Sequence, residues 1–333
     1  RSEDMDTTRM SDKALRASAI VHRVLKKEIS VKVAALEAGV TTRTIRRMKV
    51  KVRSGGAKAL AHAARGKSGN RRIGNRERKK MEKLLAEKYP DFTPTLAAEK
   101  LSELDGMSHD PKTVRSMMIA LGLWEANPKA RATHRHWRER RGKEGELLQY
   151  DGSYHPWLED RWTGPEGSHE LCLLLAIDDA TGKLMDMAFA PHEGVLPTFG
   201  FWREYALSHG LPGSIYVDRF STYKMHLALA AENPDTETQF QRVMRSLGVL
   251  LIFALSPQAK GRVERMFRTL QDRLVKELRL RGIAALEEAN IFMRETFMKE
   301  FNEKFAVPAR ETGNRHRPLT KKERETIDTI FAR

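Results

Sequence analysis

The sequence predicts a multidomain protein, in which a basic all-α N-terminal half precedes an α/β domain built on a mixed sheet. Three observations support this fold class. Helix caps, turn glycines and helical apolar spacing occupy the first 126 residues. After residue 145, short apolar runs alternate with helical segments, and two of these runs end in an aspartate. A long amphipathic helix follows from about residue 263.

Composition narrows the class of partner. The chain of 333 residues carries 60 Lys and Arg against 44 Asp and Glu, a formal charge of +16. Such an excess favours a polyanionic partner, and we expect nucleic acid rather than a membrane surface. No apolar run approaches the roughly 18 residues of a spanning helix. The single cysteine, Cys172, lies in an apolar run and is expected to be buried, which fits a reducing cytoplasm. We expect residues 1–9 to be leader or vector residues.

The range 10–52 has the pattern of a helix-turn-helix domain. Ser30 is a plausible N-cap, Gly39 supplies a tight turn, and Thr41 or Thr42 can cap the second helix. The second helix of such a unit enters the DNA major groove, although a basic solvated hairpin is the alternative. We expect inward positions at Val33, Leu36, Ile45 and Met48, and an outward basic face, suited to DNA, at Arg43, Arg46, Arg47 and Lys49.

A basic linker at 53–75 is expected to separate this domain from a second helical domain at 76–126, which also resembles a helix-turn-helix. Thr93-Pro94 and Asp110-Pro111 are start signals for two successive helices, and Gly122 ends the second one. The linker could instead be an arm that follows DNA. The outward residues that we expect to contact DNA in the second domain are Lys112 and Arg115.

The range 127–145 reads as a basic connector, because it is rich in Lys and Arg and poor in core residues. Such a segment can lie along phosphates. Its expected DNA contacts are Arg135, Arg138 and Arg140.

From residue 146 the pattern changes to strands. We expect strands at 146–151, 171–179, 183–190, 213–218 and 248–255, with 171–179 and 183–190 as an antiparallel pair. Helices are expected at 197–210, at 238–247 and from 263 onwards. This order predicts a mixed sheet with helices on its faces.

Three acidic residues stand out at the ends of these elements. Asp151 and Asp218 each end a predicted strand, and Glu264 lies on the shoulder of the apolar stripe of the last long helix. Hard carboxylate oxygens gathered at one edge of a sheet are what Mg²⁺ or Mn²⁺ requires. Asp178 and Asp179, by contrast, precede Ala-Thr-Gly and are most simply turn residues.

The motifs QYDGS, YVDRFST and SPQAKGRVERMFRTLQD together resemble the DDE catalytic core of retroviral-type integrases and insertion-sequence transposases, and in particular the bacterial ISNCY group. The resemblance implies an RNase H-like domain at 146–305. It also implies that Asp151, Asp218 and Glu264 are the catalytic residues and hold two Mg²⁺ or Mn²⁺ ions. The expected reaction is nicking of the element's ends to free 3′-OH groups, followed by their joining to target DNA.

Further residues near these motifs are candidate DNA ligands. Lys260, Arg262 and Arg268 surround the third motif and are expected to bind phosphates. His155 and Trp157 follow the first aspartate and could contact the flanking nucleotide, although Trp157 is equally well explained as a packing residue.

The chain also departs from the family pattern. The interval between Asp218 and Glu264 is longer than in retroviral integrases, with 234–240 as an expected insertion, and 306–333 reads as a C-terminal tail where relatives continue into a small β-rich domain. Two other functions stay open: a non-catalytic DNA-binding regulator, and a nuclease that cleaves without joining. Joining two ends calls for a homo-oligomer, at least a dimer on DNA.

Overall fold

The computed structural model describes residues 11–61, 73–126, 138–164, 167–218, 237–254 and 261–332. The chain divides into two compact units, Arg1–Lys80 and Met81–Arg333. Arg135, Lys260 and the expected leader 1–9 lie outside the described residues.

The N-terminal unit is built from short capped helices, α1 (Asp12–Leu25), α2 (Val31–Ala38), α3 (Thr42–Gly55) and the 3-10 turn η1 (Ala57–Leu60). Ser30 caps α2 by accepting a hydrogen bond from Val33 N at 3.3 Å, and Thr41 caps α3 in the same way. Gly39 ends α2 with a φ of 62°, a left-handed conformation that favours glycine. The caps and the turn glycine that the sequence predicts are therefore confirmed.

Two expectations for this unit are wrong. Val33 is 49% exposed and Leu36 is 84% exposed, so neither lies in the core. The inward face of α2 is formed by Ala34 and Ala35, whose small side chains permit close helix packing. The predicted start of the linker at residue 53 is also wrong, because α3 continues to Gly55 and η1 follows it.

The second unit begins within α4 (Asn75–Glu87), at Met81. It also contains α5 (Pro94–Asp105) and α6 (Pro111–Ala120). Asp110 caps α6 by accepting a hydrogen bond from Lys112 N at 2.8 Å. The chain turns after α6 at Gly122, where φ is 73°. These helices lie where the sequence predicts them.

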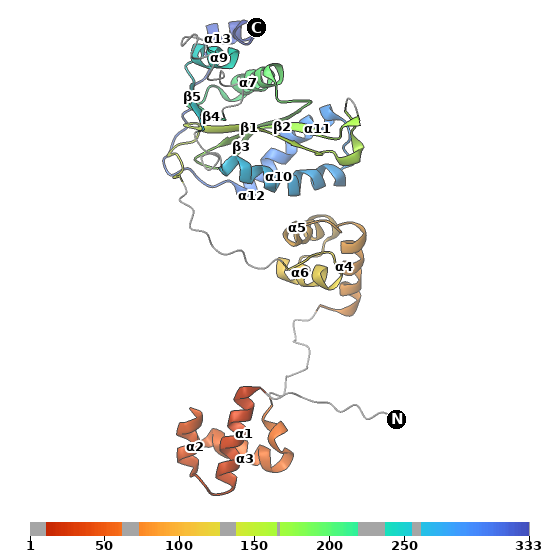
Figure 1. Ribbon diagram of the computed structural model, residues 1–333, viewed down its shortest axis with the longest axis vertical. Helices are drawn as coiled ribbons and strands as arrows, with labels where there is room; N and C mark the ends of the chain where they lie inside the picture. The colour runs from red at the N-terminus through yellow and green to blue at the C-terminus, as the bar shows by residue number, and fades with distance from the viewer. Residues whose placement is uncertain are drawn as a thin grey trace, which may run out of the picture. The chain divides into compact units, whose positions relative to one another are not determined.

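A five-stranded mixed sheet forms the centre of this unit (Figure 1). The strands follow the order β3-β2-β1-β4-β5, in which β1, β2 and β3 pair antiparallel whereas β1, β4 and β5 pair parallel. The mixed sheet with helices is confirmed and fits the expected RNase H-like domain. The strand bounds are β1 Leu148–His155, β2 Leu171–Asp178, β3 Leu184–Ala190, β4 Ser214–Val217 and β5 Leu250–Phe253.

Helices cover both faces of the sheet, and two separate apolar cores result. On one side α7 (Val195–His209) and α9 (Gln239–Ser246) pack over Leu148 and Tyr150. On the other side α10 (Gly261–Leu280) and α12 (Met298–Phe305) pack over the opposite face (Figure 1). The described residues of this unit also form short helical segments at η2 Glu159–Arg161, α11 Leu286–Phe292 and a π-helical turn at Met293–Phe297.

Two expectations for the sheet domain need correction. Asp151 does not end a strand, because β1 continues to His155 through its antiparallel pairing with β2. The range 306–333 is not a simple tail, because it contains α13 (Lys321–Ile330). Ile327 and Phe331 are buried in the same core as α7, and the Phe331 and Phe199 rings lie 5.8 Å apart.

Candidate active site

The two aspartates of the predicted site lie on neighbouring parallel strands. Leu148 and Gln149 of β1 pair with Ile215 and Tyr216 of β4. Continuing this register by two residues places Asp151 opposite Asp218, which directly follows β4. Both residues are partly buried. The register therefore brings the two carboxylates to the carboxyl-terminal end of the parallel pair, an edge where open sheets commonly bind ligands.

Glu264 lies in the first turn of α10, as the apolar spacing predicts. Val263, Phe267, Leu270 and other residues of the stripe are buried, whereas Glu264 itself is partly exposed. The Val263 backbone N–H donates to Gln149 Oε1 at 3.2 Å. Because Gln149 precedes Asp151 by two residues in β1, the start of α10 is tied to the strand that carries the first aspartate.

The part of the chain that the structure describes contains no ready three-ligand metal group. Among the residues that the structure describes, no three His, Cys, Asp or Glu side chains lie where they could hold a metal ion. The donor chemistry of Asp151, Asp218 and Glu264 does suit a hard divalent cation. Their role as metal ligands stays a prediction.

Sequence reasoning missed the role of Asp179. It treated Asp178 and Asp179 alike as turn residues, and for Asp178 this is correct, since its carboxylate accepts from Thr181 N at 2.8 Å. Asp179 is fully buried as well, but its partners lie outside the turn. Its carboxylate accepts hydrogen bonds from Gln149, Arg138, Arg262 and the Arg141 backbone N–H.

The charge state of Asp179 follows from these partners. Burial raises the pKa of this carboxyl, but the hydrogen bonds from the Arg141 N–H and Arg138 and the positive charge of Arg262 outweigh burial, so its pKa lies below the ordinary value. The one available signal in the sequence was position: a carboxylate directly after a strand buried along its whole length must find partners inside the fold.

Some of the candidate DNA ligands also form bonds within the protein. Arg138 and Arg262 both pair with Asp179, and the Arg140 guanidinium donates to Ala180 O at 3.1 Å. These bonds occupy part of their donor capacity inside the protein. Arg138 and Arg140 are nevertheless exposed, as are Arg43, Arg46, Arg47, Lys112, Arg115 and Arg268.

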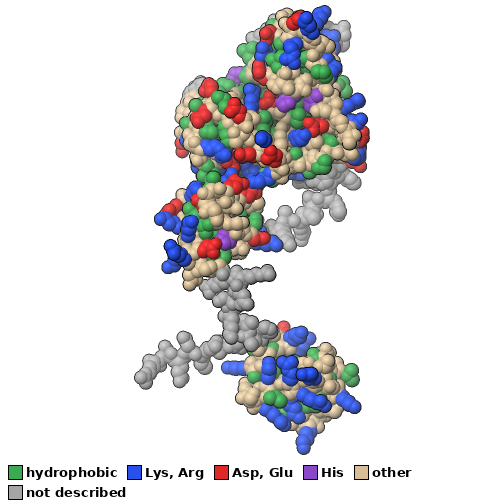
Figure 2. Space-filling model, turned by 180° about the vertical axis from the view of Figure 1, so that it is seen from behind, with side chains coloured by type: hydrophobic (Ala, Val, Ile, Leu, Met, Phe, Trp, Pro, Cys, Tyr) green, Lys and Arg blue, Asp and Glu red, His purple; other side chains and the backbone are tan. Residues whose placement is uncertain are grey.

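The space-filling view shows many Lys and Arg side chains on the visible face of the N-terminal helical unit (Figure 2). That distribution suits a polyanion, and its use for DNA stays a prediction.

The two candidate end contacts that follow the first aspartate, His155 and Trp157, differ in exposure. Trp157 is fully buried, packs beside Phe189 and donates its indole N–H to Ser153 O at 3.1 Å. Trp157 is therefore a packing residue, one of the two roles that the sequence left open, and its complete burial leaves no surface for contact with a nucleotide. His155 is partly exposed, and burial lowers its pKa below the ordinary value.

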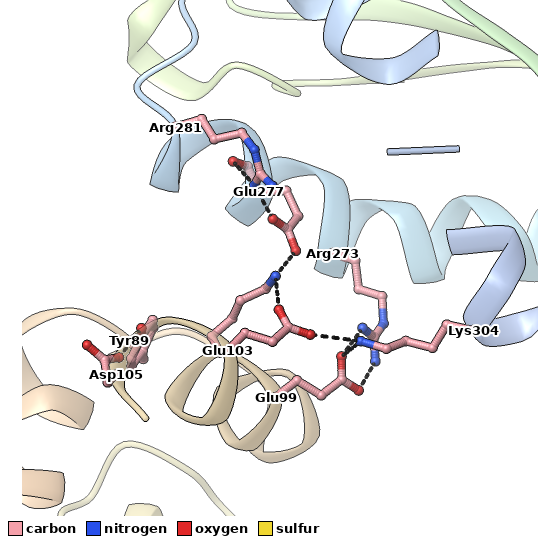
Figure 3. A network of polar contacts seen from close by, with 9 residues as sticks. Tyr89, Glu99, Glu103, Asp105, Arg273, Glu277, Arg281 and Lys304 are labelled. Atoms are coloured by element: carbon pink, nitrogen blue, oxygen red, sulfur yellow. Dashed lines mark hydrogen bonds and ion pairs between the residues drawn. The ribbon is translucent and has the colours of Figure 1, made fainter. Parts of the chain in front are cut away.

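The same helix that carries Glu264 also holds α5 through ion pairs (Figure 3). Arg273 of α10 forms a two-pronged pair with Glu99 at 2.7 and 2.9 Å. Lys304 of α12 bonds the same carboxylate at 2.8 Å, and Lys100 pairs with Glu277 of α10. Burial raises the pKa of Glu99, but its bonds to Arg273 and Lys304 prevail and lower it to about 2.

Comparison with known proteins gives the family. No family model matches the chain. It is 39% identical over 310 residues to y4bF of Sinorhizobium fredii, which is named as a candidate transposase; the match covers 93% of this chain and 66% of that protein. It is 38% identical over 170 residues to the transposase for insertion sequence IS1202 of Streptococcus pneumoniae, covering 50% of this chain and 34% of that protein. The chain thus spans less than two thirds of either relative.

Solved structures with some likeness are viral integrases. A chain of the simian T-cell lymphotropic virus intasome, in complex with PP2A regulatory subunit B56 gamma, matches with a TM-score of 0.38 and 14% identity over 72% of this chain and 80% of that one. The HTLV-2 integrase catalytic core domain in complex with magnesium matches with a TM-score of 0.32 and 16% identity over 46% and 87%. The sequence matches carry the assignment: the chain belongs to the same family as the bacterial transposases.

Proposed function

We propose that the chain is a DNA transposase that binds the ends of an insertion sequence, nicks them to free 3′-OH groups and joins these to target DNA. The observation that carries the proposal is the register of β1 and β4, which, extended by two residues, sets Asp151 opposite Asp218. The first turn of α10, which contains Glu264, is bonded to β1 through the Val263 N–H and Gln149. The two curated relatives, one named as a transposase and the other as a candidate transposase, support the same reaction class.

In this proposal Asp151 and Asp218 hold Mg²⁺ or Mn²⁺ between neighbouring strands, and Glu264 completes the ligand set. Two ions bound there would help to activate the attacking oxygen and stabilise the leaving oxygen. The chain's own contribution would be to bring these three carboxylates together at one sheet edge when metal and DNA bind, and to present basic side chains to the phosphates. Arg268 of α10, which is exposed one turn beyond Glu264, would bind such a phosphate.

The helical units supply recognition of the ends. The exposed arginines of α3, Arg43, Arg46 and Arg47, follow an N-cap threonine, which suits the entry of that helix into a groove. Lys112 and Arg115 on α6 form a second exposed basic surface. A connector bearing Arg140 would continue along the DNA backbone. At least two subunits on DNA, acting in the bacterial cytoplasm, complete the proposal.

The test uses labelled duplexes taken from the DNA on either side of the coding sequence. Asp151→Asn, Asp218→Asn and Glu264→Gln should each lower cleavage and joining by roughly 10²-fold or more, because each removes a charge worth several kcal/mol in the transition state. Binding of the duplexes should stay within about twofold of the parent. The matched control is Asp160→Asn, an exposed acid of η2, which should change neither.

Each outcome separates the proposed transposase from the other functions. Cleavage without joined products would identify a nuclease. Binding without cleavage in Mg²⁺ or Mn²⁺ would identify a regulator. Near-normal cleavage by one of the three variants would remove that residue from the site. Mn²⁺ binding followed by electron paramagnetic resonance should weaken in the same three variants and provides a readout independent of turnover.

A further inference from the structure

Asp179 is a fully buried carboxylate with an unusually complete set of donors. Its Oδ1 accepts from Gln149 Nε2 at 2.8 Å, from Arg262 Nη1 at 2.6 Å and from Arg138. Its Oδ2 accepts from the Arg141 backbone N–H at 2.9 Å. A buried charge is stable only when it is paired and hydrogen-bonded, so these four donors account for the position of Asp179 in the core.

The donors come from the elements that carry the candidate catalytic residues. Gln149 lies on β1, two residues before Asp151, and side chains two apart on a strand share a face. Arg262 lies two residues before Glu264, in the first turn of α10. Asp179 therefore touches both elements.

Gln149 closes the connection between β1 and α10. It is fully buried, its Nε2 donates to Asp179, and its Oε1 accepts from the Val263 N–H at 3.2 Å. A carboxylate on one side and an N–H on the other fix the orientation of this amide. A short chain of bonds thus runs from the strand of Asp151 through Gln149 to the backbone next to Glu264.

Two residues of the basic connector also bond the Asp179 carboxylate. Arg138 and Arg141 belong to the expected connector 127–145, and both bond Asp179. Arg262 also donates to the Arg138 carbonyl oxygen at 2.5 Å. The end of a segment expected to follow DNA is therefore joined to the start of the helix of Glu264.

We propose that Asp179 is a positioning residue, which fixes the start of α10 so that Glu264 is held at a set distance from Asp151 and is linked to the connector. The inference rests on the proposed function above. It differs from a general role in folding, because the bonds converge on the two elements of the site. A displacement of about 1 Å in such a site can cost roughly 10²-fold in rate.

The experiment compares Asp179→Asn with Asp178→Asn in the full chain. Both residues are fully buried and adjacent, but Asp178 bonds the turn at Thr181 and the Gly145 N–H, not Gln149 or Arg262. Nicking of supercoiled plasmid is followed over a Mn²⁺ titration. Asp179→Asn should lower the maximal rate about 10- to 100-fold and raise the half-saturating Mn²⁺ concentration several-fold. Asp178→Asn, if folded, should leave the half-saturating concentration within about twofold.

A double-mutant cycle tests the route of the effect. If Asp179 acts through Arg262, Asp179→Asn and Arg262→Gln should give a combined loss well short of the product of the single losses. If Asp179→Asn does not fold, as judged by thermal unfolding, Arg262→Lys carries the same Mn²⁺ test, because it keeps the charge and loses the planar fork.

Glu264→Gln, measured in parallel, separates the two proposals. A parent rate for Glu264→Gln would refute the proposed catalytic role. An inactive Glu264→Gln beside Asp179→Asn with a parent rate and parent Mn²⁺ dependence would refute the positioning role alone. Equal shifts in Asp178→Asn and Asp179→Asn would also overturn it, since they would show a general effect on folding.

Discussion

Replacing Lys100 with methionine should weaken the attachment of α5 to the sheet domain. Lys100 is 6% exposed and pairs with Glu277 of α10, which is 7% exposed, and with Glu103 at 2.7 Å (Figure 3). Methionine retains most of the apolar stem but removes the charge. The buried Glu277 carboxylate would then lose its ion pair with Lys100 and keep the one with Arg281.

The magnitude follows from burial. Removing one partner of a buried ion pair destabilises a protein by about 3–5 kcal/mol. Two features of this site reduce the effect: Arg281 continues to neutralise Glu277, and Glu103 is 44% exposed and can turn to solvent. We therefore expect a loss of about 2–3 kcal/mol, at or just below the lower end of that range.

The assay is urea unfolding of the full chain, together with hydrogen exchange of the α5 amides, which reports local opening. The control is Lys83→Met on α4. Its pair with Glu87 spans 3.9 Å with side chains 72% and 66% exposed, so this change should cost less than about 0.5 kcal/mol.

The double variant Lys100→Met/Glu277→Leu should recover most of the lost stability, because a buried pair replaced by apolar residues is often neutral. Equal effects of Lys100→Met and Lys83→Met, or no recovery in the double variant, would refute the argument from burial.

Three further predictions concern recognition, pH and assembly. Arg46→Ala and Arg47→Ala should weaken duplex binding in a gel-shift assay, whereas Arg16→Ala, at an exposed position of α1, should not. If either arginine contacts a base, its loss should reduce the discrimination between element ends and random DNA by about 1–3 kcal/mol, and equal affinity of the parent for both would contradict specific recognition. The pKa of Glu99 is lowered to about 2, so the contribution of its ion pairs to stability is complete above about pH 4.5 and is lost as the pH falls towards 2. The difference in unfolding free energy between the parent and Glu99→Gln should shrink over that window, and a constant difference would count against the pairing. Light scattering with end duplexes should show at least two subunits per pair of joined ends and a complex that weakens steeply with salt; one subunit, or indifference to salt, would exclude the proposed assembly.

The sequence by itself determined the local structure of this protein. Ser30, Thr41 and Asp110 were identifiable as caps, and Gly39 as a turn, because capping depends on residues within one turn of the chain. The apolar runs predicted the strands, and the stripe beginning at Val263 predicted α10, for the same local reason. The family motifs led to the three candidate carboxylates without any knowledge of the sheet order.

Only the tertiary structure decided which side chains meet. The side of α2 that is buried depends on its neighbours, and the structure leaves Leu36 in solvent while Ala34 and Ala35 pack inward. Pairing with β2 carries β1 four residues beyond Asp151. The partners of Asp179 lie 30 to 83 residues away in the chain. No periodicity records such separations, because the stability of a buried carboxylate depends on donors that the fold brings together from distant segments.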